Sequence, residues 1–310
     1  MNKKPTVCLT GGRGMVGRNI LEHPMAERFT FIAPTSAELD LRNFDRVQNY
    51  LTLHAPEFVI HTAGLVGGIQ ANMARPVDFL VDNVDLGRNV ILASRNAGVK
   101  KLLNLSSSCM YPRNASNPLT EDLILRGELE PTNEGYALAK IVAMRLCEYI
   151  HKEDAAFQYK TFIPCNLYGR FDKFDPKHSH LIPAIIHKVH QAKALDEKSV
   201  EIWGDGMARR EFMFAGDLSD AVLRALIDFD EVPFLMNVGL GVDHSINDYY
   251  QAVAKIVGWS GQFTHDLTRP VGMKQKLVSI ERQSAWGWHA TTSLEDGIAK
   301  AYEFYLKSIQ

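Results

Sequence analysis

The sequence predicts an α/β protein: a Rossmann-type, doubly wound parallel sheet followed by a smaller C-terminal substrate-binding α/β lobe. Two observations predict this fold. Short β-rich runs alternate with helical patterns through the first half of the 310-residue chain, and strands that alternate with helices form βαβ units with a parallel sheet. A glycine-rich turn, Gly11–Gly17, also follows the first run directly.

The elements of the first half follow from these patterns. The expected strands are Thr6–Thr10, Phe31–Ala33, Phe58–Thr62, Lys101–Ser106 and Tyr159–Ile163. The expected helices are Met15–Leu21, Asp45–Leu53, Asp78–Asn96 and Gly135–His151.

The regular alternation of strands and helices ends after about Asn166. A helix is expected over Ile182–Ala192, further helices near 217–229, 245–257 and 292–307, and short strands at 200–203, 211–214 and 235–239. No linker rich in Gly, Ser or Pro separates the halves. We therefore expect domains at 1–165 and 166–310, with segments of the second packing back on the first and a cleft at the carboxyl ends of the strands.

Composition narrows the class of protein. Hydrophobic residues make up 46% of the chain, charged residues 23%, and the formal net charge is −2. This balance predicts neither nucleic acid nor an anionic membrane as partner. No apolar run approaches the roughly 18 residues needed to span a bilayer, and the N-terminus does not read as a signal peptide. The four scattered cysteines lack CxxC spacing, which predicts reduced thiols and a cytoplasmic location.

The turn after the first strand has the pattern GxxGxxG, with glycines at 11, 14 and 17. One glycine reverses the chain, another lets backbone N–H groups approach a pyrophosphate, and the last lets the helix pack on the strand. Such a pattern alone is a weak signal, but its place at the first βα junction predicts dinucleotide binding.

The segment after the second strand bears on the choice between NAD and NADP. Residues 33–36 read Ala-Pro-Thr-Ser and carry no carboxylate to bind a ribose diol, while Arg13 can fork onto a 2′-phosphate. These features favour NADP(H), although Arg13 could equally be a solvated surface residue. The residues expected to bind the cofactor are Gly11, Gly12, Arg13, Gly14, Met15, Val16, Gly17, Asp40 and Leu41.

A possible reactive group begins at Tyr136, four residues before Lys140. On a helix the two side chains share one face. A nearby ammonium is expected to lower the pKa of the phenol toward the range of a general acid–base, and the same lysine can hold the nicotinamide ribose. Ser107, after the fourth strand, can donate to a substrate carbonyl oxygen.

These motifs together resemble the extended short-chain dehydrogenase/reductase superfamily and, within it, the GDP-L-fucose synthase family. That family comprises GDP-4-keto-6-deoxy-D-mannose 3,5-epimerase/4-reductases. The segments that carry the closer resemblance are Arg13–Gly17, Val66–Ile69, Ser107–Pro112, Glu130–Glu134, Asn166–Gly169, His180–Pro183, Trp203–Gly204, Arg210–Phe212 and Asn237–Gly239.

The resemblance implies roles for further residues. Cys109 would be the base and His180 the acid that invert carbons next to the keto group, while Tyr136 and Ser107 hold the enolate oxygen. If the fourth strand continues, the side chains of Ser107 and Cys109 point the same way. Lys140 and His180 would also contact the cofactor. The implied nucleotide-sugar ligands are Asn166, Lys188, Trp203 and Arg210, although Trp203 could instead be a core residue.

Histidines at 178, 180, 187 and 190 crowd one segment, but their spacing fits no metal motif, and we expect no metal. The family also implies a homodimer in which helices near 83–97 and 136–151 pair with their mates. Both helices have broad apolar faces, which could equally pack on their own sheet.

Several segments depart from the family pattern. Phe214–Asp217 stands where His-Val-Asp-Asp is usual, Ser36 replaces a basic residue, and Val271–Lys276 replaces an Asp-Gly-x-Pro-Arg-Lys segment. Arg170 and Phe171 replace a Pro-His pair expected beside the sugar.

These departures leave the identity of the sugar substrate open. GDP-L-colitose synthesis, which epimerises C5 of a 3-deoxy sugar, and GDP-sugar 4-reduction without epimerisation, as on a GDP-linked heptose, remain alternatives. A non-catalytic NADP-binding protein would be expected to have lost the Tyr-Lys pair. Ser108 and Cys109 stand where a 4,6-dehydratase carries an Asp-Glu pair, and a UDP-sugar 4-epimerase would need no Cys/His pair.

Overall fold

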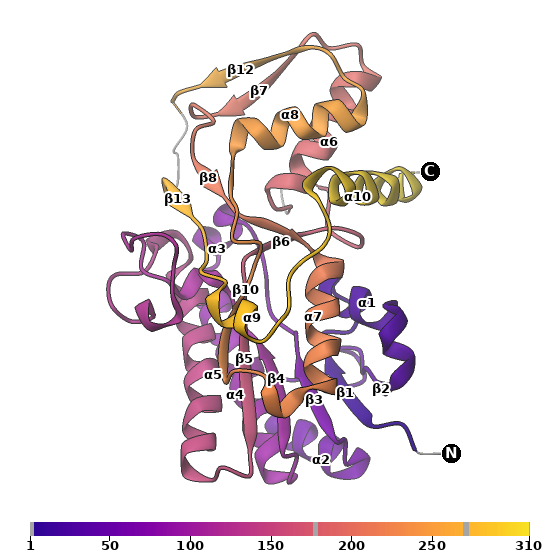
Figure 1. Cartoon of the computed structure of the whole chain (residues 1–310), viewed down its shortest axis with the longest axis vertical. Helices are drawn as coiled ribbons and strands as arrows, with labels where there is room; N and C mark the ends of the chain where they lie inside the picture. The colour runs from indigo at the N-terminus through magenta and orange to yellow at the C-terminus, as the bar shows by residue number, and fades with distance from the viewer. Residues whose placement is uncertain (1–2, 176–178, 269–272, 310) are drawn as a thin grey trace.

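The computed structural model describes residues 3–175, 179–268 and 273–309. His178 and the Val271–Gly272 part of the divergent segment lie outside these ranges. Figure 1 shows a sheet flanked by helices, with a second lobe above it.

The first body is built on a six-stranded sheet in the order β10-β5-β4-β3-β1-β2. Every neighbouring pair in it is parallel. Its strands are β1 (Thr6–Thr10), β2 (Thr30–Ile32), β3 (Phe58–His61), β4 (Lys101–Leu105), β5 (Gln158–Pro164) and β10 (Leu235–Val238). The associated helices are α1 (Met15–Leu21), α2 (Phe44–His54), α3 (Ile69–Ala74), α4 (Pro76–Asn96), α5 (Glu134–Glu153) and α7 (Ala215–Ile227).

The second body contains three small sheets. They pair β6 (Asn166–Tyr168) with β9 (Phe212–Phe214), β7 (Ser199–Trp203) with β12 (Gln262–Asp266), and β8 (Arg209–Arg210) with both β11 (His244–Ser245) and β13 (Gln275–Lys276). Its helices are α6 (Leu181–Ala194), α8 (Ile246–Val257) and α10 (Leu294–Ser308). Helix α9 (Glu281–Ala285) lies beside β10 of the first body. The 3₁₀ turns of the chain are η1 (Pro24–Arg28), η2 (Ser108–Met110), η3 (Glu121–Leu123), η4 (Pro131–Asn133) and η5 (Phe229–Glu231).

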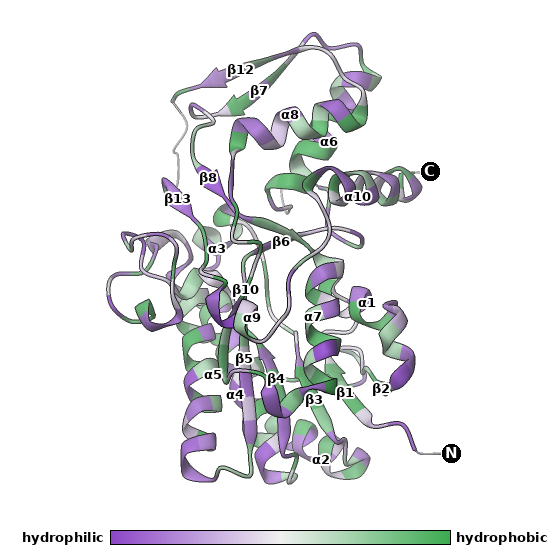
Figure 2. Ribbon diagram, in the orientation of Figure 1, coloured by the Kyte–Doolittle hydropathy of each residue, from purple (hydrophilic) through white to green (hydrophobic). Residues whose placement is uncertain are grey.

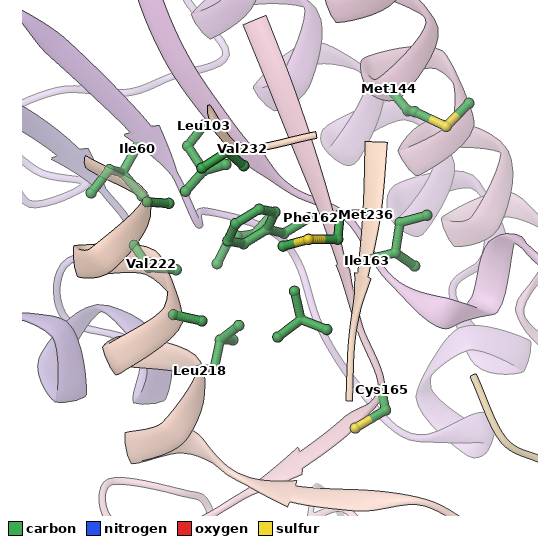
Figure 3. Close-up of a cluster of buried hydrophobic side chains, with 14 of the residues drawn as sticks. Ile60, Leu103, Met144, Phe162, Ile163, Cys165, Leu218, Val222, Val232 and Met236 are labelled. Atoms are coloured by element: carbon green, nitrogen blue, oxygen red, sulfur yellow. The ribbon is translucent and has the colours of Figure 1, made fainter. Parts of the chain in front are cut away.

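Strand alternation divides the core of the first body into two layers. Ile60, Leu103 and Phe162 belong to the cluster that contains Leu218 and Val222 of α7, and Figure 3 shows these side chains facing one another. Val59, Leu102 and Tyr159 face the opposite way, into the layer with residues of α2, α4 and α5. Figure 2 shows hydrophobic colour along the interior strands and more hydrophilic colour on outward helix faces.

Besides α9, a strand and a helix of the second half return to the sheet. β10 pairs in parallel with β5, and α7 covers one face. The 235–239 strand was expected from its apolar pattern, but that pattern did not reveal that it forms the edge of the main sheet.

No helix in the described ranges is long and apolar enough to cross a membrane.

Candidate active site

The glycine turn has the geometry that its spacing predicts. Gly11 has a φ of +75°, and a Cβ there would lie 2.7 Å from Thr62 Oγ1. A Cβ on Gly17 would lie 2.3 Å from the Gly11 carbonyl oxygen. The turn therefore requires glycine at both ends, one for its dihedral angles and one for the close approach of α1 to the loop.

The other expected cofactor residues surround this turn. Gly14 is the N-cap of α1 and Met15 is its first residue, while Gly12 is buried against Ala33. Arg13 is exposed. The Asp40 carboxylate accepts hydrogen bonds from Arg42 Nε at 3.0 Å and Nη2 at 2.9 Å, which hold the pKa of Asp40 at about 2.

The Tyr136–Lys140 pair lies at the start of α5. Lys140 is buried, and its Nζ donates to the Leu105 carbonyl oxygen at 3.0 Å and lies 5.7 Å from the Tyr136 ring centroid. Burial lowers the pKa of Lys140 to about 8. Below it, at the end of β3, His61 is fully buried against Thr10, and burial and then the Lys140 charge lower the pKa of His61 to about 3.

The expected lowering of the Tyr136 pKa is wrong for this structure. Burial raises the pKa of Tyr136, the charge of Cys109 adds to the rise, and a hydrogen bond with Ser107 opposes it. The cost of removing a phenolate from water outweighs the hydrogen bond from Ser107. The structure therefore favours Tyr136 as a protonated donor.

The strand continuation expected at Ser107 and Cys109 is also wrong. β4 ends at Leu105, and Ser108–Met110 form the turn η2. Ser107 is the N-cap of this turn, and its Oγ accepts a hydrogen bond from the Cys109 N–H at 3.3 Å. The cap, rather than strand alternation, therefore joins the Ser107 side chain to the backbone of Cys109.

Two donors that the sequence did not reveal contact the Cys109 sulfur. Asn133 Nδ2 lies 3.3 Å from Sγ, and Lys276 Nζ, on β13, lies 3.8 Å from it. Cys109 is half-buried, whereas Cys8, Cys147 and Cys165 are buried. The thiol therefore lies at a junction of the first body with the divergent segment that ends at Lys276.

His180 stands apart from this cluster in the contacts that the structure gives. It is the N-cap of α6 and is exposed as a residue. Partial desolvation of its ring and then the Lys173 charge lower the pKa of His180. The preceding residue approaches the first body, because a Cβ on Gly68 would lie 3.8 Å from the Ser179 carbonyl oxygen.

The implied nucleotide-sugar residues lie in the second body. Asn166 Nδ2 donates to the Glu211 carbonyl oxygen at 3.0 Å, and Lys188 Nζ donates to the Glu201 carbonyl oxygen. Arg210 is half-buried and donates through Nη1 to the Arg209 carbonyl oxygen at 2.8 Å. Trp203 is 51% exposed, so the alternative that it is a core residue is wrong.

The neighbouring histidines have tyrosine partners. His187 Nδ1 lies 3.0 Å from the Tyr305 hydroxyl, and His190 Nδ1 lies 3.0 Å from the Tyr302 hydroxyl. In the described ranges no group of three or more His, Cys, Asp or Glu side chains is placed to hold a metal ion.

Arg170 and Phe171 contact the cofactor-motif helix. Arg170 pairs with Glu22, and the Arg18 guanidinium lies 3.7 Å above the Phe171 ring. Phe171 also packs edge-on to Phe304 of α10. These contacts join the second body to α1, and the place of both residues beside the sugar stays a prediction.

Two cavities lie near α5. A cavity of about 250 Å³ between α3, α4 and the start of α5 is lined by Asn72, Phe79, Asn133 and Tyr136, among others. A cavity of about 850 Å³ on the side of β10 is lined by residues such as Arg145, Tyr159 and Arg282, and none of its described lining residues is an expected site residue. The smaller cavity is therefore the one that adjoins the expected catalytic residues, through Tyr136.

A family model described as the NAD dependent epimerase/dehydratase family matches residues 7–239. The chain belongs to this family. It is 52% identical over 300 residues to a GDP-L-colitose synthase of Yersinia pseudotuberculosis, with 97% of each chain covered. It is 51% identical over 306 residues to a GDP-L-fucose synthase of Azorhizobium caulinodans, with 99% of this chain and 98% of the other covered.

The fold comparison agrees with the family. The crystal structure of a GDP-D-glycero-L-gluco-heptose synthase from Campylobacter jejuni, in the presence of NADPH, has a TM-score of 0.89 at 31% identity and 99% coverage of both chains. The predicted fold class and the predicted resemblance are confirmed.

The contacts of Asn237 and Glu211 give a structural role to two motifs that the sequence analysis left without one. Asn237 donates through Nδ2 to the carbonyl oxygens of Leu119 and Ser279 and accepts a 2.5 Å hydrogen bond from Tyr111. Glu211 accepts three backbone N–H groups, which lower its pKa, although burial raises the pKa of Glu211 to about 7 overall. Both residues join loops of the two bodies at the edge of the site.

Proposed function

We propose that this chain is an NADPH-dependent epimerase/reductase that acts on GDP-4-keto-6-deoxy-D-mannose, epimerises C3 and C5, reduces C4 and forms GDP-L-fucose. One observation carries the proposal: a half-buried thiol with two nitrogen donors adjoins the Ser107–Tyr136–Lys140 group. A simple reductase needs the latter group but has no use for a base beside it.

The cofactor fits the glycine turn. Its backbone is held open by glycines where a Cβ would overlap neighbouring atoms, and the exposed Arg13 can pair with a 2′-phosphate. Residues 11–17, 40 and 41 would hold the adenosine and pyrophosphate, and Lys140 and His180 the nicotinamide end. NADPH supplies the hydride that reduces C4.

The thiol would work first. Protons on C3 and C5 are acidic because they lie next to the keto group, and a Cys109 thiolate can remove one. Asn133 and Lys276 donate toward its sulfur. Ser107 and Tyr136 donate to the enolate oxygen, and His180 returns a proton to the opposite face of the ring. The lowered pKa of His180 makes its protonated form a stronger acid.

The tyrosine would complete the reduction. Because burial raises the pKa of Tyr136, it holds its proton until an alkoxide forms at C4. Lys140, buried below the ring, stabilises the phenolate left after that transfer. Asn166, Lys188, Trp203 and Arg210 would bind the nucleotide, the two cations neutralising the diphosphate.

A second candidate is GDP-L-colitose synthesis, favoured by the 52% identity to the Yersinia enzyme. The same residues would serve, with inversion at C5 alone. A different class, a non-catalytic NADP-binding protein, is disfavoured because Tyr136 and Lys140 are both present and placed together.

The deciding experiment incubates the protein with NADPH and GDP-4-keto-6-deoxy-mannose in D₂O and locates deuterium in the product by NMR. Deuterium at C3 and C5 with NADPH oxidation supports the proposal, and deuterium at C5 alone supports the colitose candidate. Oxidation without exchange leaves a 4-reductase. Cys109→Ser and His180→Gln should each lose exchange and still bind NADPH; normal exchange in either removes that residue from the mechanism.

We assign cofactor binding to residues 1–165 and sugar-nucleotide binding mainly to 166–310, with β10 and α7 contributing to the first body. A cytoplasmic location suits the four free cysteines.

The protein is proposed to be a homodimer formed through α4 and α5. Large apolar side chains on these helices are 39% to 68% exposed: Val77, Val81, Leu138, Val142 and Tyr149. Exposed apolar groups of this kind mark interaction surfaces. Val142→Glu should convert a species of twice 34.8 kDa to a monomer in sedimentation, whereas Leu53→Glu, on α2, should not. A wild-type monomer at working concentration would contradict the assignment.

A further inference from the structure

Glu211 is a buried carboxyl group between β8 and β9, with 1% of its surface exposed. Its Oε1 accepts the N–H groups of Leu240 at 2.6 Å and Gly241 at 2.9 Å. Its Oε2 accepts the N–H of Val278 at 2.9 Å. A buried carboxyl group is costly unless hydrogen-bonded, and here its N–H donors come from two segments that lie far apart in the sequence.

The surroundings are shaped to receive this side chain. A Cβ on Gly239 would lie 2.5 Å from Glu211 Oε1 and 2.6 Å from Val278 Cγ2. Any side chain at 239 would therefore displace the Glu211 carboxyl group or the Val278 side chain.

Val278 connects Glu211 to the reactive thiol. Lys276, two residues before Val278, pairs with Arg210 in the β13–β8 ladder, and its Nζ lies 3.8 Å from Cys109 Sγ. On its other side the segment is held by Leu119, whose N–H donates to the Leu277 carbonyl oxygen and whose own carbonyl accepts the Ser279 N–H, both at 2.8 Å. Glu211 thus attaches this segment to the second body at Val278, two residues beyond the β13–β8 ladder.

From this geometry we propose that Glu211 is a positioning residue that holds the segment around Val278 and thereby keeps the Lys276 ammonium against the Cys109 sulfur. The catalytic part of this inference rests on the proposed epimerase function. Glu211 itself touches neither the thiol nor the expected substrate positions; it acts through Lys276.

The acceptor chemistry identifies the right substitution. All three partners are N–H donors, so Glu211→Gln keeps the size but turns an NH₂ group toward a donor on one side. The amide oxygen keeps the most partners when it faces Leu240 and Gly241, which leaves its NH₂ against the Val278 N–H. We therefore expect Glu211→Gln to release the Val278 side.

Two measurements on the full-length protein test this. The first is the rate at which iodoacetamide alkylates Cys109, followed by mass spectrometry, which needs neither substrate nor the proposed function. The second is deuterium exchange into the 4-keto sugar. Glu211→Gln and Lys276→Met should each slow both by about tenfold, the scale of one lost charge interaction near the surface. The NADPH dissociation constant should change by less than about threefold.

The double variant decides between positioning and general weakening. If Glu211 acts through Lys276, Glu211→Gln/Lys276→Met should be no slower than Lys276→Met alone. The matched control is Asp217→Asn, because Asp217 also is buried and accepts backbone N–H groups, from Thr291 and Thr292, outside this site. It should lower thermal stability and leave alkylation and exchange at wild-type rates.

Multiplicative losses in the double variant, wild-type alkylation in Glu211→Gln, or an equal loss in Asp217→Asn would each overturn the inference. If Glu211→Gln does not fold, Glu211→Asp, which keeps the charge but withdraws it by one methylene, replaces it in the same cycle. The alkylation rates can follow the expected pattern in all variants while the wild type does not turn over the 4-keto sugar. That outcome would contradict the proposed function but support the positioning role of Glu211.

Discussion

Replacing Gly17 with alanine tests the cofactor turn from its own geometry. A Cβ at this position would lie 2.3 Å from the Gly11 carbonyl oxygen and 2.6 Å from Gly12 Cα. Both neighbours are backbone atoms, so no flexible side chain can rotate away. The loop has to separate from α1 by about 0.7 Å before the oxygen contact reaches even 3.0 Å.

The magnitude follows from that displacement. Forcing an extra carbon into a closely packed site costs about 1–3 kcal/mol, which corresponds to a fall of several degrees in the midpoint of thermal unfolding. The moved atoms also form the expected pyrophosphate site. NADPH binding should therefore weaken by on the order of tenfold for each 1.4 kcal/mol of lost interaction.

Gly14→Ala is the matched control within the same motif. The nearest atom to its Cβ would be the Gly11 oxygen at 3.3 Å, and its φ of −74° suits alanine. Thermal unfolding of the unliganded protein should therefore change by less than about 0.5 kcal/mol. NADPH titration by fluorescence can still detect weaker binding in this variant, because the added methyl group stands where the backbone meets the pyrophosphate.

Comparison of the two variants thus separates displacement of the glycine turn from loss of its contact with the pyrophosphate. If Gly17→Ala unfolds with the wild type, or if Gly14→Ala is the less stable of the two, the reasoning from close approach is refuted.

Two further predictions concern residues elsewhere in the fold. Gly216→Asp, which restores the usual family residue, should lower the unfolding temperature, because its Cβ would lie 2.7 Å from Phe214 Cε1. Adding Phe214→His should recover part of the loss. A Gly216→Asp protein with the unfolding temperature of the wild type would contradict this prediction. Burial lowers the pKa of Lys140 from 10.5 to about 8, so the unfolded chain binds more protons between these values and the contribution of Lys140 to stability rises with pH there. Relative to Lys140→Met, the wild type should gain on the order of 1–3 kcal/mol from pH 8 to 10.5 in urea titrations; a constant difference would show that the pKa is not shifted.

The parts of the fold that depend on local rules could be predicted from the sequence. The first strand and helix, Thr6–Thr10 and Met15–Leu21, have the expected bounds because the glycine turn between them fixes where one ends and the other begins. The partner of β10 could not be predicted. Met236 and Val238 are buried apolar residues, and such a run reads the same at the edge of the main sheet as in a separate lobe.

Some residues of the site could likewise be predicted from the sequence, and others could not. Tyr136 and Lys140 were predictable because four residues on a helix place two side chains on one face. Asn133 and Lys276 were not, because their contacts with Cys109 span 24 and 167 residues of chain. The direction of the Tyr136 pKa was missed for a physical reason: a spacing argument shows the neighbouring ammonium but not the burial that raises the pKa.

The contacts of Cys109 also imply that the two proposed half-reactions depend differently on how the lobes meet. Ser107, Tyr136 and Lys140 all lie in the first body, so the reducing group is complete without the second. The thiol takes one donor from each: Asn133 from the turn before α5 and Lys276 from β13. Asn237 fixes both sides of that junction by donating to Leu119 and Ser279. A change that loosens the junction without unfolding either body should therefore impair proton exchange at C3 and C5 before it impairs hydride transfer to C4. Substitution of Ser107 or Tyr136 should instead impair both reactions, since these residues hold the oxygen on C4 in each step.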